Sequence, residues 1–351
     1  MESIRTLLEL IPGYRDLPEF LQATLPPFCA SLVIFAFIGI LVMFLVWMER
    51  KVSAHMQDRL GPMYTGGWHG WAQLIADSIK LLTKEDIIPA AADRILFKTA
   101  PFIVFVGAFA AFVVLPFGVS SIVSDLNIGI LYVVAITSLS VVGIIMAGWS
   151  SNNKWALYGG MRGAAQIVSY EIPAAMAIMV VVMQASSLSM QDIVNAQKGG
   201  VLHWFIFRNP FTFVAFFVYF ICSLAEVNRT PFDIPEAESE LVAGYHTEYS
   251  GMRFAFFYMS EYTNMFVVSA IAVTLFLGGW TSALPESLLP RWSPPGPVHF
   301  VLKAIILIFI QMWLRWSLPR LRVDQLMHMC WKVMIPLSFV LILGAGLLMV
   351  Y

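Results

Sequence analysis

The feature that most constrains this chain is a series of eight long apolar segments. They lie at residues 28–48, 99–119, 127–149, 163–185, 207–225, 259–279, 299–317 and 330–350. A helix needs about 20 predominantly apolar residues to cross a bilayer. The chain is 59% hydrophobic and 12% charged, against roughly 25% charged in a soluble domain. The sequence therefore predicts an all-α, polytopic membrane protein, with about eight transmembrane helices in a single membrane domain over residues 1–351.

The distribution of basic residues predicts the orientation of these helices. Joining segments on one side hold fifteen of the 21 Lys and Arg residues, and the other side with the termini holds six. Lys and Arg accumulate in cytoplasmic loops. We therefore expect both termini on the outer side. Residues 1–26 would form an outer, partly helical arm, since they lack the pattern of a cleaved signal peptide.

Two cytoplasmic segments, residues 50–98 and 226–258, are too long to be simple turns. In the first, Asp77, Lys80 and Lys84 fall together on one face of a helical repeat. The opposite face carries Trp71, Leu74, Ile75, Ser78, Ile79 and Leu82. This pattern predicts an amphipathic helix that lies at the membrane surface or against a partner.

The second segment opens an acidic stretch, residues 226–262, that holds seven of the 22 acidic residues. These are Glu226, Asp233, Glu236, Glu238, Glu240, Glu248 and Glu261. Like charges this close to a low-dielectric phase cannot all stay ionised, so they should titrate as a coupled set and handle protons. Pro231 and Pro235 interrupt any helix here, and non-helical backbone near a membrane is tolerated only when buried in protein or lining a water-filled cavity.

One acidic residue lies inside a predicted crossing. Glu171 stands nine residues beyond Arg162, which places it roughly 13 Å into the helix at about 1.5 Å per residue. A carboxylate at that depth costs on the order of 3 kcal/mol, and intramembrane ionisable groups are functional candidates by default. The alternative is that Glu171 stays protonated and bonds a neighbouring helix.

Simpler interpretations also stay open for several charged residues. Glu49 and Arg50 could only mark the charged end of the first crossing, and Asp77 could belong to a solvated helix face. Arg315 and Arg320 could do no more than set topology. His246, within the acidic stretch, could relay protons near neutral pH or only bond a neighbour.

The remaining chemistry-bearing residues form no recognisable site. The six histidines show no metal-ligand spacing, and Cys29, Cys222 and Cys330 stand alone in or beside apolar runs. Nucleotide-binding glycine fingerprints and nucleophile elbows are absent from the sequence. We therefore expect the chain to hold no metal or redox cofactor and to run no covalent chemistry by itself.

Five motifs together resemble the H-subunit family of bacterial NADH-quinone oxidoreductase, respiratory complex I, whose mitochondrial counterpart is NADH dehydrogenase subunit 1. They are ERKVSAHMQDRLGP at 49–62, ADSIKLLTKED at 76–86, RGAAQIVSYEIP at 162–173, the acidic stretch, and RWSLPRLRVDQLMHMCWK at 315–332. The resemblance runs from Pro27 to the C-terminus, in the family's order. It implies a multi-pass protein of the bacterial inner membrane.

The resemblance also implies roles for particular residues. The family forms most of a tunnel through which a long-tailed quinone, ubiquinone or menaquinone, reaches the last iron-sulfur cluster. FMN and the iron-sulfur clusters belong to partner subunits of the peripheral arm, and small membrane-arm subunits lie alongside. Residues matching the tunnel motifs are Glu49, Arg50, Arg59, Asp77, Glu236, Arg315 and Arg320. Those matching the protonic path are Glu171, Glu226, Glu238, Glu240, Glu248 and Glu261. Asp233, together with the other loop acids, would respond to charge on the quinone.

Two other functions fit parts of the pattern. A homologous membrane subunit of an energy-converting hydrogenase or formate hydrogenlyase would couple hydrogen chemistry to ion movement without quinone. A stand-alone proton or solute transporter would typically show an internal repeat of crossings, and the sequence shows none.

Overall fold

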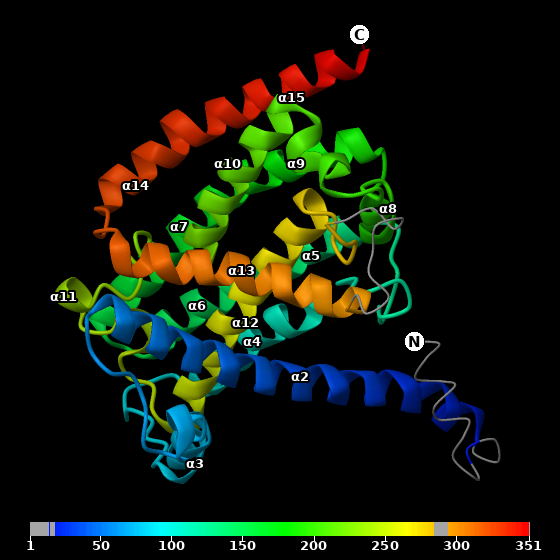
Figure 1. Ribbon diagram of the computed structural model, residues 1–351. Helices are drawn as coiled ribbons and strands as arrows, with labels where there is room; N and C mark the ends of the chain where they lie inside the picture. The colour runs from blue at the N-terminus through cyan, green and yellow to red at the C-terminus, as the bar shows by residue number, and fades with distance from the viewer. Residues whose placement is uncertain (1–13, 15–17, 284–293, 351) are drawn as a thin grey trace.

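The computed structural model describes Tyr14, residues 18–283 and residues 294–350, without the side chains of Glu238 and Ser239. The described chain consists of helices and connecting loops (Figure 1). The membrane-length stretches comprise α2 Glu19–Met56, α4 Arg94–Ala111, α5 Gly129–Thr137, α6 Leu139–Ser150, α7 Lys154–Ala185, α10 Pro210–Glu226, α12 Gly251–Phe276, α13 Gly296–Ser317, α14 Val323–Met329 and α15 Ile335–Val350. Shorter elements are η2 Trp68–Gly70, α3 Gln73–Thr83, α8 Met190–Asn195, η3 Val201–His203, α9 Phe205–Arg208, α11 Glu238–Leu241 and η4 Gly244–His246, and a π-helical turn, η6 Cys330–Met334, joins α14 to α15.

The predicted all-α membrane fold is confirmed. Within the described ranges, seven helical stretches are long and apolar enough to cross a membrane, and the shorter apolar helix α10 makes an eighth. The third crossing is α5 with α6, which are interrupted at Ser138, and the last is α14 with α15. The predicted outer arm falls largely on residues 1–13 and 15–17, outside the described residues.

The first crossing is longer than the sequence predicts. We expected it to follow Pro27 and to end at Glu49, but α2 runs from Glu19 to Met56. Proline has no N–H to donate to the carbonyl four residues earlier. The Tyr14 hydroxyl donates to that carbonyl, on Gln22, at 3.0 Å, which helps α2 continue through Pro26. Glu49 does not end the helix because its charge is paired inside the protein, as described below.

Side-chain caps set several other helix ends. Asp93 accepts from the backbone N–H groups of Ile95 and Leu96 at the start of α4. Asn153 accepts from the N–H of Trp155 and starts α7 nine residues before the predicted crossing. α4 ends at Ala111 rather than near residue 119, because a turn carries the chain on towards Pro116.

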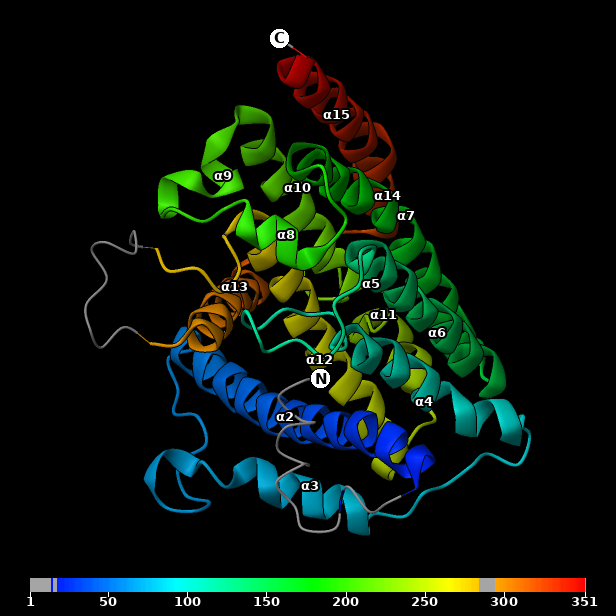
Figure 2. The same cartoon turned by 90° about the vertical axis from the view of Figure 1, so that its right-hand side faces the viewer.

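α12 is the central helix of the molecule, and it packs against α4, α13, α2 and α10. α7 packs against α6, α10 and α15. In Figures 1 and 2, α2 and α3 border one side of the molecule while α14 and α15 lie on the opposite side. Phe37 of α2 and Phe266 of α12 join an aromatic core with ring centroids 6.0 Å apart. The other rings of this core are Phe112, Phe117 and Phe300.

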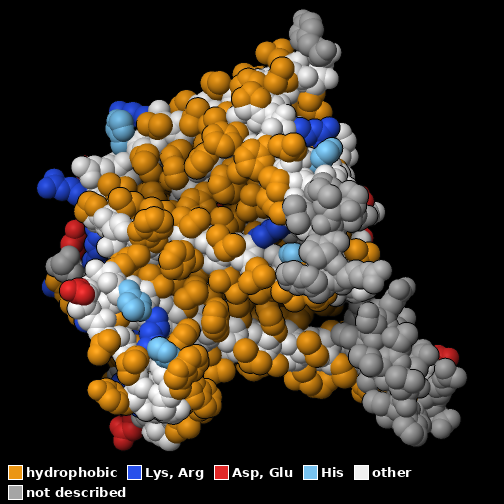
Figure 3. Space-filling view, viewed as in Figure 1, with side chains coloured by type: hydrophobic (Ala, Val, Ile, Leu, Met, Phe, Trp, Pro, Cys, Tyr) orange, Lys and Arg blue, Asp and Glu red, His pale blue; other side chains and the backbone are white. Residues whose placement is uncertain are grey.

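The surface agrees with a membrane environment. Hydrophobic side chains cover most of the face in Figure 3, and charged side chains gather at its left edge, where Figure 1 shows α11 and α3. The predicted amphipathic helix is present as α3. Leu74 is buried against the protein, while Ile75, Ile79 and Leu82 are exposed. This exposed apolar face suits either a membrane surface or a partner.

Candidate functional site

The first part of the acidic stretch forms a loop that is buried in the protein. After α10 ends at Glu226, residues 227–235 are all buried, and the chain enters α12 at Gly251. The Gln166 amide of α7 donates to the carbonyls of Ala225 at 2.8 Å and Phe232 at 2.7 Å. The prediction that this non-helical backbone is buried rather than solvated is therefore confirmed.

Glu49 is the centre of a buried charge cluster. Its carboxylate accepts two bonds from Arg229, at 3.1 and 3.2 Å, one from the Tyr262 hydroxyl at 2.5 Å, and a further one from Arg315. Arg229 also pairs through Nε with Glu261 at 2.9 Å, and its guanidinium lies 4.5 Å from the Tyr262 ring centroid. We call these five residues the Glu49 cluster. They come from α2, the acidic loop, α12 and α13.

The charges of this cluster balance one another. Arg229 is 3% exposed, and burial alone would lower its pKa, but Glu261 and Glu49 outweigh burial and hold the pKa of Arg229 well above its ordinary value. Two guanidinium groups therefore face two carboxyl groups. Buried ions persist only when they are paired in this way.

Three further predicted tunnel residues form ion pairs beside the cluster. Asp77 of α3 accepts from Arg50 at 2.6 Å and lies 3.6 Å from Lys80. Burial raises the pKa of Asp77, but the hydrogen bond and charge of Arg50 outweigh it and lower the pKa overall. Arg320 pairs with Asp233 at 2.9 Å.

Other predicted residues lie apart from the cluster. Arg59 stands in an exposed turn after α2 and bonds Gln57 at 2.7 Å. Arg162 pairs with Glu240 at the surface, at 2.6 Å, and Glu248 accepts from Asn153 at 2.7 Å. The side chain of Glu238 lies outside the described part of the chain.

Glu236 lies near His246, with Oε1 3.8 Å from Nδ1. Burial lowers the pKa of His246 to about 4. The imidazole is therefore neutral at pH 7, and this contact is not an ion pair.

Glu171 and Glu226 meet at small cavities in the membrane-spanning bundle. Glu171 accepts a hydrogen bond from the Ser138 hydroxyl, at the break between α5 and α6. Both carboxyl groups line two cavities, each with about 20 Å³ of room for a water molecule. A third cavity of the same size places Glu226 beside Glu261. The three acids are thus neighbours in space, although they come from α7, α10 and α12.

Comparison with known proteins shows the family to which the chain belongs. Residues 29–346 match the sequence model of the NADH dehydrogenase family. The chain is 59% identical to the H subunit of NADH-quinone oxidoreductase from Chlorobaculum tepidum, over 84% of each chain. It is 47% identical to the H subunit from Geobacillus kaustophilus, over 95% of each chain. The chain belongs to the H-subunit family of NADH-quinone oxidoreductase. It is therefore a multi-pass membrane subunit of that enzyme, and other subunits of the complex are its partners.

Sequence reasoning did not place three residues that the structure brings to the site of this NADH-quinone oxidoreductase subunit. Arg229 is the one Lys or Arg between Glu226 and Glu248, a signal that could have marked it as their counter-ion. Tyr262 directly follows Glu261, but nothing in the sequence shows that it reaches α2. Ser138 is one of many helix hydroxyls, so its contact with Glu171 had no sequence signal.

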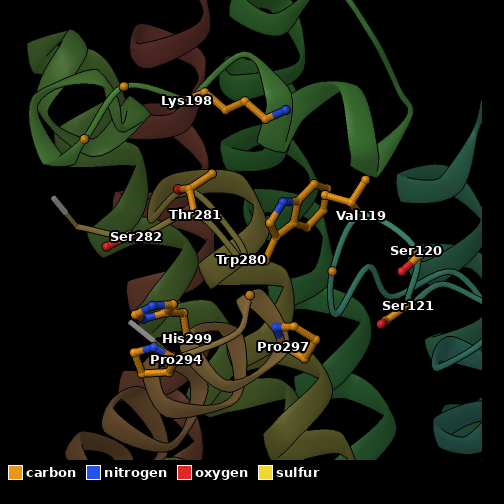
Figure 4. A pocket seen from close by; sticks show the side chains of 14 residues that line it. Val119, Ser120, Ser121, Lys198, Trp280, Thr281, Ser282, Pro294, Pro297 and His299 are labelled. Atoms are coloured by element: carbon orange, nitrogen blue, oxygen red, sulfur yellow. The ribbon is translucent and has the colours of Figure 1, made fainter. Parts of the chain in front are cut away.

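A larger cavity lies away from these acids. It has a volume of about 410 Å³ and is lined by residues such as Ser121, Lys198, Trp280 and His299, with none of the predicted site residues (Figure 4). Among the described residues, no group of three or more His, Cys, Asp or Glu side chains could hold a metal ion. The contacts described above make the candidate site of this oxidoreductase subunit one of ion pairs and carboxyl groups.

Proposed function

We propose that this chain forms the quinone-access tunnel of its complex and couples quinone reduction to proton translocation through buried acids. The observation that carries the proposal is the Glu49 cluster together with the cavities that join Glu261, Glu226 and Glu171. Glu49 and Arg315 belong to the predicted tunnel residues, whereas Glu261 belongs to the predicted proton path. Arg229 contacts both sets, so a charge change at the tunnel would be felt by the path.

The coupling step is electrostatic. A quinone that gains two electrons becomes a dianion and takes up two protons. At roughly 8 Å and an effective dielectric of about 20, one new negative charge raises the proton affinity of a nearby carboxylate by about 2 kcal/mol, which is between one and two pKa units. Asp233, Glu236, Glu238 and Glu240 are the loop acids that would respond, and proton capture would then reorganise the loop.

Shared cavities join Glu261 to Glu226 and Glu226 to Glu171, which supports a path in this order. A proton that leaves the loop would pass by Glu248, Glu261 and Glu226 to Glu171 and on to neighbouring membrane-arm subunits. We further propose that the acidic loop faces the cytoplasm and that both termini face outside. The excess of Lys and Arg on that side supports this orientation.

The substitution Glu171→Gln tests the proposal. It keeps the size of the side chain and removes its titratable proton. We expect NADH-driven quinone reduction and proton pumping by the intact complex to fall together, while electron transfer from NADH to an artificial acceptor stays unchanged. Glu85→Gln, at an exposed glutamate in the α3–α4 loop, is the matched control. Wild-type turnover and pumping in Glu171→Gln would show that this residue has no part in coupling.

A further inference from the structure

Three polar side chains meet where the cavity of Glu171 adjoins the cavity of Glu261. Ser140 of α6, Glu226 of α10 and Asn264 of α12 line both cavities. The other residues common to both are apolar, Ile167 and Val227. We call Ser140, Glu226 and Asn264 the junction, because they stand between Glu171 and Glu261. The three residues come from three different helices.

None of the three side chains has a hydrogen-bond partner among the residues that the structure describes. The Asn264 oxygen Oδ1 is fully buried without a partner. The Ser140 hydroxyl differs from those of Ser78 and Ser269, which donate to the carbonyl four residues earlier. Buried polar groups without partners are rare in native proteins, and ordered water is a common reason for them.

The cavities have the size and polarity that ordered water needs. Each offers about 20 Å³ of room for a water molecule, and a buried water needs about 10–15 Å³ and two to four polar partners. In each cavity, the unpaired hydrogen-bonding groups of the junction supply at least two such partners. Glu171 in one cavity and Glu261 in the other supply a further partner. An apolar cavity of this size would stay dry.

We infer that Ser140 and Asn264 are positioning residues, which hold ordered water between Glu261 and Glu226 and between Glu226 and Glu171. The inference rests on the proposed proton path. In one step, a proton leaves the Glu261 carboxyl for the bridging water, and another proton of that water passes to Glu226. The water is restored, Glu226 becomes neutral, and Glu261 is left as a carboxylate paired with Arg229.

Two substitutions of Asn264 separate this role from a packing role. Asn264→Leu keeps the branching and the number of side-chain heavy atoms and removes both hydrogen-bonding groups, whereas Asn264→Ser leaves a polar group and more room for water. If Asn264 holds water, Asn264→Leu should lower quinone-linked turnover more than Asn264→Ser. A packing role predicts the opposite order, because a smaller side chain leaves a larger cavity.

The assay is NADH-driven quinone reduction by the intact complex, with electron transfer to an artificial acceptor as the measure of assembly. We expect Asn264→Leu to lower quinone-linked turnover about tenfold or more, and Asn264→Ser to retain most of it. Thr263→Val is the matched control, since the Thr263 hydroxyl bonds only its own helix, at Met259. Wild-type turnover in Asn264→Leu, or Ser more damaging than Leu, would overturn the inference.

Two further measurements keep the inference separate from the proposal beneath it. If Glu226→Gln and Glu261→Gln lose quinone-linked turnover while Asn264→Leu does not, only the inference of bridging water is wrong. If all three variants keep that turnover, the proposed proton path itself is wrong. A structure of the wild-type complex that resolves water should show density within about 3 Å of Asn264 and Glu226. A dry junction among otherwise visible buried waters would contradict the inference.

Discussion

Replacing Arg229 by Met is expected to destabilise the acidic loop more than any other single loss of charge in the Glu49 cluster. The Arg229 guanidinium lies 3.1 Å from Glu49 and 2.9 Å from Glu261. Arg315 still neutralises Glu49 in the variant, but Arg229 is the one cation within 4.0 Å of Glu261 among the described residues. Removing one partner of a buried pair costs about 3–5 kcal/mol.

Amide hydrogen exchange of residues 226–262 in the purified complex measures this loss directly. A decrease of about 3 kcal/mol in the free energy of local opening corresponds to roughly hundredfold faster exchange. Arg315→Met is the matched control, because the Arg315 side chain is 27% exposed and Arg229 remains beside Glu49. Its loss should cost about 1 kcal/mol.

A combined variant tests the electrostatic reason. Arg229→Met together with Glu261→Gln leaves Glu49 paired with Arg315 and no carboxylate without a counter-ion, so much of the protection should return. Equal exchange in Arg229→Met and the wild type would refute the reasoning. So would a double variant that opens as readily as the single one.

Two other predictions concern the packing of the same loop. His246 has a pKa of about 4 in the folded protein, below its value of about 6.5 in the unfolded chain. Between these pH values the unfolded chain therefore binds more protons than the folded protein. The contribution of His246 to the free energy of unfolding is fully present above pH 6.5 and falls by about 3 kcal/mol as the pH drops towards 4. His246→Phe should flatten that part of the pH dependence of thermal inactivation, and an unchanged profile would exclude this origin. Gly159→Ala would place a Cβ 2.7 Å from backbone atoms of Gly244 and Tyr245 and should cost about 1–3 kcal/mol of stability, measured as a lower melting temperature of the complex. Gly39→Ala, with nothing within 4 Å, should be neutral or slightly stabilising, and equal effects of the two glycine substitutions would contradict the close contact.

The crossings and the special status of Glu171 could be predicted because both depend on local composition. An apolar run long enough to span a bilayer has few alternatives to a transmembrane helix. A carboxyl group within such a run needs a partner wherever it lies, and the structure supplies Ser138. α3 was equally predictable, because the polar and apolar faces that identify it lie within one local segment of eleven residues.

The contacts of the site could not be predicted in the same way, since they join distant parts of the chain. Arg229 and Glu49 are 180 residues apart in sequence, and Tyr262 and Glu49 are 213 apart. Their meeting depends on how α2, α12 and α13 pack, which apolar periodicity does not encode. Arg59 illustrates the converse, because it stands only ten residues from Glu49 yet lies in an exposed turn outside the cluster.

The proposed coupling requires that quinone reduction changes the protonation of the buried acids. Infrared difference spectroscopy of the intact complex, recorded as its quinone is reduced, measures this at the carboxyl stretching band. We expect a signal from protonated carboxyl groups that is lost in Glu226→Gln and in Glu171→Gln but kept in Glu85→Gln. A carboxyl signal that is the same in all three variants and the wild type would contradict it.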